Sequence, residues 1–285
     1  MDHSAMYLSF FIIGHLGLSG REFIRVGWVQ YLLHKLYAVL EPTILRITDF
    51  IFSIKLLTDT VAGREILKLV ATAAWALPHG VVITTEAAER VIDFIMETEY
   101  ANGAKLAVGP CVCQMALHRW KEPSMKDMVV LYGADIYLHL KLGYRLINAD
   151  EAKDMLRRFH KVGLVHEIDF CMHSGRWTFV ICNCEKEICV LTRAHLLTGK
   201  LLYPGPEIVS HDPEKCVGVD KCGLCIKRCI FDANIIEGDK VRVDYDKCMG
   251  CGLCVTTCKG NARSMARRKD YSYDKIIPSN ILLGE

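Results

Sequence analysis

The hydrophobic positions in the first hundred residues predict helices. Residues 21–54 are dense in Leu, Ile, Val, Tyr and Phe, and their charges are dispersed singly. A helix that is apolar on most sides is buried in a large core, in an oligomer interface or at a membrane. Residues 69–85 form a second uncharged run, which Pro78 and Gly80 divide into a helix, a turn and an apolar segment. Residues 1–105 are therefore expected to be a mainly helical scaffold or docking region.

The next hundred residues alternate between strand and helix patterns. Residues 105–108 and 177–181 are short apolar segments with strand character. Residues 149–167 predict a helix followed by a turn. The helix is amphipathic with an acidic first turn, and Gly163 ends it before the strand-like pair Leu164-Val165. This helix–turn resembles half of a winged helix, but its basic residues are few. Residues 106–205 are therefore expected to form a small α/β, winged-helix-like module that packs rather than binds nucleic acid.

Composition and charge narrow the functional class. The chain has 285 residues, 51% hydrophobic content and a net charge of +2, so two or three domains are expected and bulk charge does not indicate nucleic acid. Residues 6–18 are apolar but lack a basic flank, and they are shorter than the roughly 20 residues of a spanning helix. A cytoplasmic protein is expected, and contact of the apolar N-terminus with a membrane surface or an oligomer partner stays open.

Eight of the 14 cysteines form two tetrads near the C-terminus. Each tetrad ends in the spacing C-x2-C-x3-C, and both contain Cys-Gly-Leu-Cys, at 222–225 and at 251–254. This is a short internal duplication. Cysteines clustered in this way are typical of metal ligands in a reducing compartment.

The spacing predicts two [4Fe–4S] clusters. Three thiolates from one tight loop bind one cluster, and the fourth, three residues further on, points to the other cluster. Zinc ribbons leave half of these cysteines unexplained, and a disulfide framework needs an oxidising compartment. The expected ligands are Cys216, Cys222, Cys225 and Cys258 for the first cluster, and Cys248, Cys251, Cys254 and Cys229 for the second.

Residues 207–268 thus resemble a bacterial-type dicluster ferredoxin domain, which implies a βαββαβ-type fold. Two departures from that pattern are visible. Five residues, instead of two, separate Cys216 from Cys222, so a longer loop has to bring Cys216 to the first cluster. Ile230 and Lys259 stand where the usual proline follows the fourth cysteine.

A second group of cysteines lies in the central region, as two Cys-x-Cys pairs that each follow a predicted strand. Residues i and i+2 of a strand share one face, so both sulfurs of a pair can converge on one metal. Five thiolates suffice for a third cluster or for another four-thiolate metal site, whereas the alternative is that they pack as small buried apolar groups. The candidates are Cys111, Cys113, Cys182, Cys184 and Cys189.

Pro-Cys-x-Cys, then Cys-Asn-Cys, then a dicluster ferredoxin is similar to the multi-cysteine ferredoxin-like proteins of strict anaerobes, over residues 105–268. Gln114 stands where those proteins typically have Arg, and Glu185 where a further Cys often stands. The resemblance implies redox work and favours a metal at the central cysteines.

We therefore expect an α+β iron–sulfur protein with regions 1–105, 106–205, 206–268 and a tail at 269–285. Its expected function is one-electron transfer through two [4Fe–4S] clusters and a third Fe–S or other metal site. It would act as a subunit or partner of a low-potential redox complex, because no nucleotide-binding G-x-G-x-x-G motif is present. A basic run at 259–269 and the tail are candidate contacts for that partner.

Two alternatives stay open, and no catalytic residue is assigned from the sequence. In the first, the protein is a reductase whose central thiolate-bound cluster does substrate chemistry. In the second, it is a cluster-bearing sensor or assembly factor.

Overall fold

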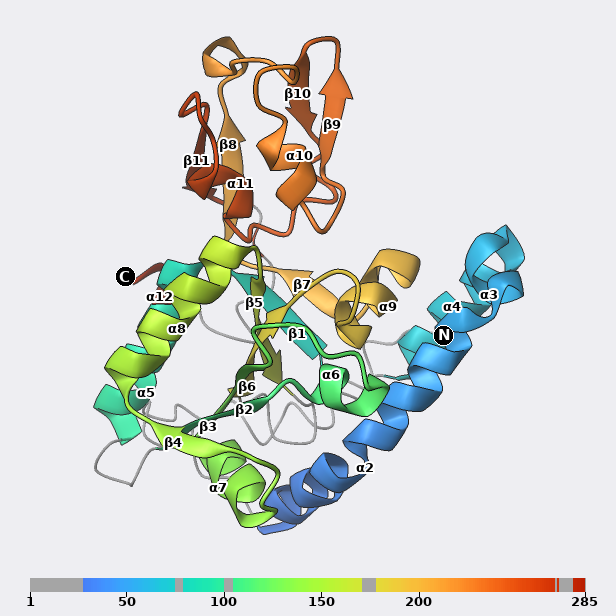
Figure 1. Ribbon diagram of the computed structural model, residues 1–285, viewed down its shortest axis with the longest axis vertical. Coiled ribbons are helices and arrows are strands. Elements are labelled where there is room, and N and C mark those ends of the chain that lie inside the picture. The colour runs from blue at the N-terminus through green and yellow to red at the C-terminus, as the bar shows by residue number, and fades with distance from the viewer. Residues whose placement is uncertain are drawn as a thin grey trace.

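The computed structural model describes residues 28–74, 79–99, 105–170, 178–269, 271 and 279–284. The apolar segment 6–18 and Cys171 lie outside the described residues. The chain forms an α/β unit around one large sheet, and a smaller unit built from residues after 206 stands at one end of it (Figure 1).

The α/β unit is organised by a seven-stranded sheet of order β4-β2-β3-β6-β5-β1-β7. Neighbouring strands are antiparallel except for β1 and β7, which run parallel at one edge. The strands are β1 (His79–Ile83), β2 (Leu106–Pro110), β3 (Met125–Val130), β4 (Arg145–Ile147), β5 (Val165–Phe170), β6 (Thr178–Cys184) and β7 (Leu202–Pro204).

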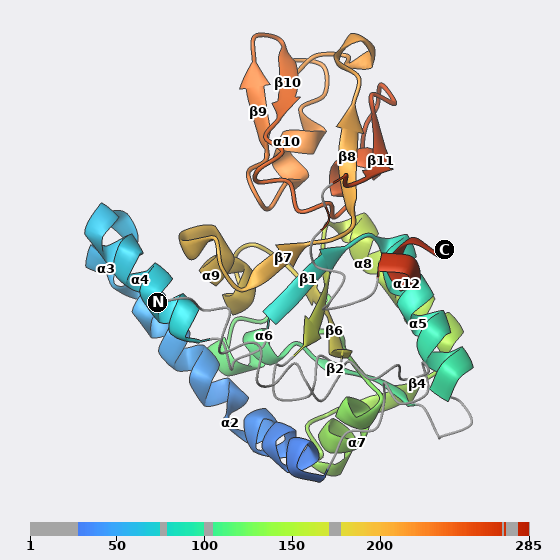
Figure 2. The same ribbon diagram turned by 180° about the vertical axis from the view of Figure 1, so that it is seen from behind.

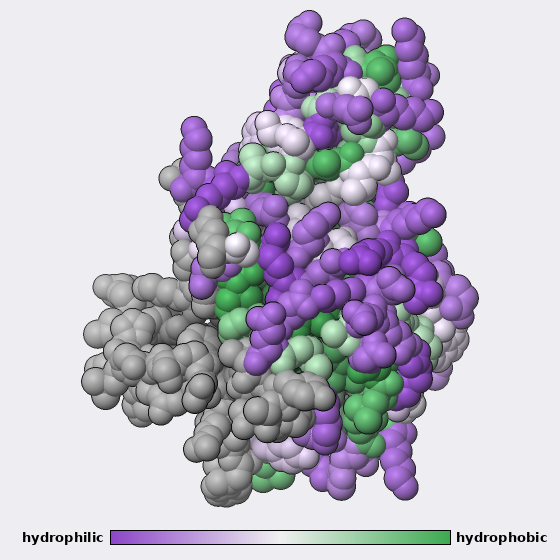
Figure 3. Space-filling model, turned by 90° about the vertical axis from the view of Figure 1, so that its left-hand side faces the viewer, coloured by the Kyte–Doolittle hydropathy of each residue, from purple (hydrophilic) through white to green (hydrophobic). Residues whose placement is uncertain are grey.

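Helices α5 (Thr85–Glu99) and α8 (Ala149–Val162) cover one face of the sheet. Thr84 accepts a hydrogen bond from the Ala87 amide at the start of α5, and Gly163 ends α8 with a φ of 100°. Ion pairs from α8 to α5 line the outside, and the surface over this layer is mostly hydrophilic with apolar patches between (Figure 3). Helix α8 begins at the predicted residue and ends at Gly163, as the sequence pattern indicates.

A second layer of helices covers the opposite face (Figure 2). Ala38 of the long first helix packs there against Ala107 and Val129 of the sheet, and Pro42 lies inside the same helix. The helices on this side are α2 (Trp28–Ser53), α3 (Lys55–Asp59), α4 (Val61–Ala73), α6 (Val112–Leu117), α7 (Tyr132–His139) and α9 (Val190–Thr198).

The structure differs from the expected division at residue 105. Strand β1 pairs with β5 and β7, and α5 packs on the same core as α8. Residues 79–99 therefore belong to the unit built around the central sheet. The winged-helix resemblance is not confirmed, because α8 leads into a central strand of a seven-stranded sheet. Strand pairing of this kind joins residues far apart in sequence, which local patterns do not reveal.

The C-terminal unit contains two small antiparallel pairs, β8 with β11 and β9 with β10. It rests on the sheet unit through a hydrogen bond between the His160 ring and Thr256, another from Thr84 to Glu207, and a shared apolar cluster. Its elements are β8 (Glu207–His211), a 3₁₀ turn (Pro213–Lys215), α10 (Leu224–Arg228), β9 (Asn234–Glu237), β10 (Lys240–Val243), α11 (Leu253–Thr256) and β11 (Arg263–Arg267).

The expected extended tail ends in a short helix, α12 (Ser279–Leu283), that packs on the chain itself. Leu282 is fully buried in the core under α5, and Arg90 donates a hydrogen bond to its carbonyl oxygen. This part of the tail therefore covers the sheet unit.

Helices α2, α3 and α4 keep many large apolar side chains exposed, such as Phe50, Val61 and Leu69. Among the residues that the structure describes, no helix is both long enough and apolar enough to cross a membrane.

The sheet contains one fully buried histidine, His166, whose ring nitrogens contact Asn183 (2.6 Å) and Thr85 (3.0 Å). Burial lowers the pKa of His166 from its usual 6.5 to about 4. Between these values the unfolded chain binds a proton that the folded chain does not, so stability is lost as pH falls.

We expect His166→Gln to lose roughly 2 kcal/mol less stability than the wild type between pH 7 and pH 5. Thermal unfolding at the two pH values measures this difference. His139→Gln, a change at an exposed histidine, should retain the wild-type pH dependence, and equal losses in wild type and His166→Gln would contradict the assignment.

Candidate functional site

Strand alternation brings thiols and carboxyls to the sheet face that α2 covers. In β6, Val180 packs in the core on the α2 side, whereas Ile181 packs in the core on the α5–α8 side. Cys182 and Cys184 therefore face α2, since residues i and i+2 share a face. In the neighbouring strand, Glu167 pairs with Cys182 and points to the same side.

All five central cysteines lie in one connected group. The Cys113 thiol is hydrogen-bonded to Cys111 and to Cys189, and the Cys184 thiol to Cys182 and Cys189. Cys111 stands just before α6 and Cys189 just before α9, so two helix starts and one strand end supply the sulfurs. The structure thus brings together the five residues that the Cys-x-Cys pattern singled out.

Cys189 is the thiol most easily ionised in this group. Hydrogen bonds from Cys113 and Cys184, and then from Thr192, hold the pKa of Cys189 well below its usual range. The Thr192 amide lies 3.4 Å from the Cys189 sulfur, at the N-terminal end of α9. A helix N-terminus favours a thiolate, and the thiolate is the form that binds metal.

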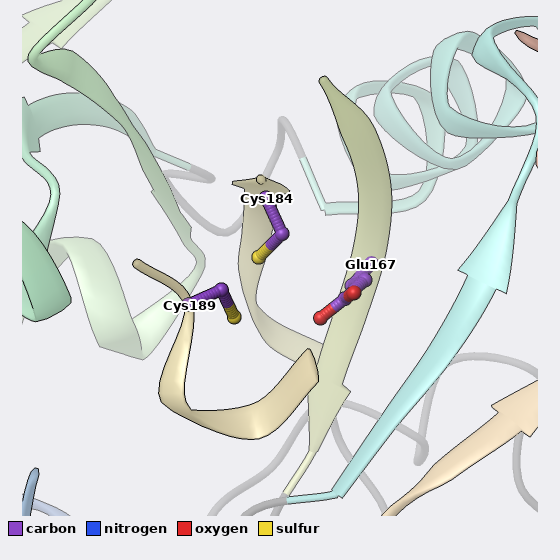
Figure 4. A group of neighbouring side chains, drawn as sticks. All are labelled: Glu167, Cys184 and Cys189. Atoms are coloured by element: carbon purple, nitrogen blue, oxygen red, sulfur yellow. The ribbon is translucent and has the colours of Figure 1, made fainter. Parts of the chain in front are cut away.

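Glu167 joins this group and was not foreseen from the sequence. Its carboxylate and the sulfurs of Cys184 and Cys189 lie within 4.8 Å of one another (Figure 4). Burial raises the pKa of Glu167 well above its usual range, and Oε2 has no hydrogen-bond partner among the described residues. The alternation His-Glu-Ile-Asp at 166–169 was the available signal, because it places two acids on one face of a strand.

A buried ion pair lies next to the thiols. Lys126 is 2% exposed, and its ammonium group donates to Glu185 at 2.6 Å. Gln114 also donates to Glu185, at 3.2 Å, and Lys121 pairs with its other oxygen at 2.7 Å. The two positions that depart from the multi-cysteine family, Gln114 and Glu185, are therefore in direct contact with each other.

The thiols open into a cavity of about 200 Å³, here called the central cavity. Asp127 lines this cavity and accepts hydrogen bonds from Tyr144 and from the Cys182 thiol. Burial raises the pKa of Asp127 to about 6. The cavity therefore combines thiols and carboxyls with an apolar lining.

The eight C-terminal cysteines lie around two separate small cavities, each of about 20 Å³. Each group contains three cysteines of one repeat and the last cysteine of the other, as the crossed pattern predicts. One cavity is lined by Cys216, Cys222, Cys225 and Cys258, the other by Cys248, Cys251, Cys254 and Cys229. Four thiols around one small space are a donor set that fits a [4Fe–4S] cluster.

The duplication extends to the backbone around these cavities. The amide of Ala233 donates to the Cys229 sulfur at 3.3 Å, and that of Ala262 to the Cys258 sulfur at 3.2 Å. Gly223 and Gly252 each precede a short helix with φ of 62° and 78°. Matching hydrogen bonds to sulfur show that both repeats support their last cysteine in the same way.

The longer Cys216–Cys222 loop is held by the β9–β10 turn. The Val219 amide donates to the Asp239 carbonyl at 2.7 Å, and the Lys240 ammonium group donates to the Cys216 carbonyl. The three additional residues therefore fold outward, and Cys216 stays beside the other cysteines that line the first cavity.

Arg263 differs from the expectation that residues 259–269 form a basic surface. It is 7% exposed, hydrogen-bonds to the Cys254 thiol, and donates to Asn234 at 2.8 Å. Its positive charge also acts on Cys225, which belongs to the other group of four. One buried cation thus lies between the two cysteine groups.

Residues 241–264 match the family model described as the 4Fe-4S binding domain. The match includes four cysteines of the second repeat, so the expected ferredoxin-type iron–sulfur domain is confirmed. No solved structure matches the chain.

Three curated relatives match over short stretches. Pyruvate synthase subunit PorD of Methanothermobacter marburgensis is 40% identical over 59 residues, which cover 20% of this chain and 64% of the relative. A putative dimethyl sulfoxide reductase iron-sulfur protein of Halobacterium salinarum is 38% identical over 56 residues, 19% of this chain and 21% of the relative. Archaeal-type glutamate synthase [NADPH] of Dehalococcoides mccartyi is 35% identical over 65 residues, 22% of this chain and 12% of the relative.

The chain therefore spans less than two thirds of each of these relatives. Their names describe a glutamate synthase, an iron-sulfur subunit and a pyruvate synthase subunit. The similarity covers about a fifth of this chain.

The Lys126–Glu185 pair yields a stability prediction. Lys126→Met leaves Glu185 with Gln114 and the exposed Lys121 but without its buried cation, so we expect a loss of roughly 3 kcal/mol. Lys121→Met should cost at most about 1 kcal/mol, because the Lys121 side chain is exposed and Glu185 keeps Lys126. Chemical unfolding of the two variants side by side tests this, and equal losses would contradict a buried charge pair.

Proposed function

We propose that the protein relays single electrons through two [4Fe–4S] clusters in residues 206–268 and a third Fe–S or metal centre at the central thiols. A [4Fe–4S] cluster supplies a one-electron carrier whose potential depends on nearby charge, hydrogen bonds and burial. The protein would work as a subunit or partner of a low-potential oxidoreductase complex.

The observation that carries this proposal is the separation of eight thiols into two groups of four around two cavities. Each repeat gives its last cysteine to the other group, so both groups depend on both repeats. Cys216, Cys222, Cys225 and Cys258 would hold the first cluster, and Cys248, Cys251, Cys254 and Cys229 the second.

The packing supports an order for the three centres. Cys229 and Cys251, which belong to the second group, pack in one apolar cluster with Val165 and Leu202 of the sheet unit. Val165 is the register partner of Cys184 on the neighbouring strand. Both small cavities are lined only by residues of the C-terminal unit, so the order rests on these contacts of Cys229 and Cys251. We propose that the second group faces the central thiols and that the first group faces the redox partner.

The central site is also the basis of the second candidate function, a reductase that carries out substrate chemistry there. Five thiols and Glu167 exceed the four ligands of a [4Fe–4S] cluster, and the cavity beside them is large. Cys113, Cys184 and Cys189 form the centre of the thiol group and are the residues we propose as ligands first.

The partner contacts are proposed from the surface. The exposed apolar side chains of α2–α4 support docking to another protein or to a membrane surface. Among the basic residues 259–269, Arg263 is excluded from that role by burial, whereas Arg267 and Lys269 are exposed.

Iron content distinguishes the centres. Protein purified without oxygen should contain about twelve iron atoms per chain if all three centres are [4Fe–4S] clusters, and about eight if the C-terminal unit acts alone. Cys189→Ser should remove only the iron bound at the central thiols.

Cys254→Ser should remove the EPR signal of the second cluster and stop electron transfer, and an unchanged spectrum would refute that ligand assignment.

Arg263 should raise the potentials of the clusters on either side of it, because a nearby positive charge stabilises the more negative reduced state. We expect Arg263→Met to lower both potentials by tens of millivolts, where about 59 mV is a tenfold change in a one-electron equilibrium. An EPR-monitored redox titration measures them. Arg267→Met, a change at an exposed arginine on the same strand, should shift them far less.

A further inference from the structure

The central cavity is much larger than the two cavities that the C-terminal cysteines enclose. It measures about 200 Å³, against about 20 Å³ for each of the others. Four thiols line each of the smaller cavities. A centre held by the central thiols would therefore leave much of the larger cavity free.

The free part has an apolar wall. Ile44, Ile51 and Phe52 of α2, with Leu67 and Ala71 of α4, are among the residues that line it. Such side chains offer nothing to a metal, whereas pockets for small organic molecules are mainly apolar with a few polar groups. An apolar cavity of about 150 Å³ is enough to hold benzene, so the central cavity as a whole has the volume for one six-membered ring.

One acid stands on this apolar wall. Glu41 of α2 lines the cavity, and its two oxygens accept hydrogen bonds from Tyr137 (2.7 Å) and Tyr37 (3.4 Å). Burial raises the pKa of Glu41 to about 8, so the carboxyl is mostly protonated at neutral pH. A neutral carboxyl has one O–H that can donate to a ligand oxygen, in addition to the lone pairs that accept from the two tyrosines.

We propose that the central cavity binds a small, largely apolar organic molecule that presents a carbonyl-type oxygen to Glu41, beside the central thiols. Its role as an electron acceptor or donor rests on the proposed function, whereas its binding does not. The molecule would lie between the apolar wall of α2 and α4 and the sulfurs on the sheet.

The test uses two probes of nearly the same shape, acetophenone and ethylbenzene, of which only the first has a carbonyl. Titration calorimetry on the full-length, anaerobically purified protein should show one acetophenone site per chain. Ethylbenzene should bind about five- to tenfold more weakly, the ratio that one hydrogen bond supplies. Glu41→Met should weaken acetophenone to the level of ethylbenzene.

The location of the binding site is tested by variants that fill the cavity. Ala71 lines it and Ala73, on the same helix, is exposed. Ala71→Phe should abolish binding of both probes, and Ala73→Phe should leave it unchanged. The wild-type comparison of the two probes needs no variant, so it stands even if Ala71→Phe fails to fold.

Three results would overturn the proposal: no binding of acetophenone at millimolar concentration, equal binding of both probes, or binding that survives Ala71→Phe in folded protein. Iron analysis of the same samples separates this from the proposed function. About eight irons per chain with acetophenone bound would remove a third [4Fe–4S] cluster and keep the ligand site. About twelve irons without binding would do the reverse.

Discussion

The centre of the sheet can bury only a small net charge, and this limits how many of the acidic groups there can be ionised. Five thiols and the carboxyls of Asp127, Glu167 and Asp169 share one interior face, and Lys126 is a buried cation beside them. Burying several anions together costs far more free energy than one lysine returns, so most of these groups keep their protons or share a metal. The raised pKa values of the acids follow from this limit. The lowered pKa of Cys189 marks the thiol where ionisation begins.

The chain uses the same chemistry differently in its two units. In the C-terminal unit, backbone amides of Ala233 and Ala262 and the guanidinium of Arg263 stabilise sulfur, and the enclosed spaces are small. In the sheet unit, side chains contact the sulfurs, and they leave a large, partly apolar space. The first arrangement is suited to holding a carrier in a fixed environment. The second has room for a molecule that enters and leaves.

The parts that could be predicted from the sequence are those fixed by local geometry. The tetrads were recognisable because loop geometry ties ligand spacing to a cluster. The segments at 105–108 and 177–181 were recognisable as short apolar strands, and 149–167 as an amphipathic helix and a turn. Glu167 and Asp127 were missed because their place depends on which strands become neighbours. The same tertiary pairing makes residues 79–83 a strand of the central sheet, although they lie in the predicted helical region. Arg263 was expected on the surface because its neighbours in sequence are basic, and only the fold shows it between the two repeats.

The connection between the two units is itself a strand. Strand β7 is hydrogen-bonded along β1, the Gly205 amide donates to the Met249 carbonyl, and Arg268 returns to donate to the carbonyls of Gly205 and Cys248. A side chain at Gly205 would meet the Val82 carbonyl at 2.4 Å. Carriers on flexible tethers deliver electrons by swinging between donor and acceptor, and their rate depends on tether length. Here hydrogen bonds hold the joint on both sides, so the fold sets the spacing between the C-terminal cysteines and the central thiols, and the proposed relay would need no domain movement.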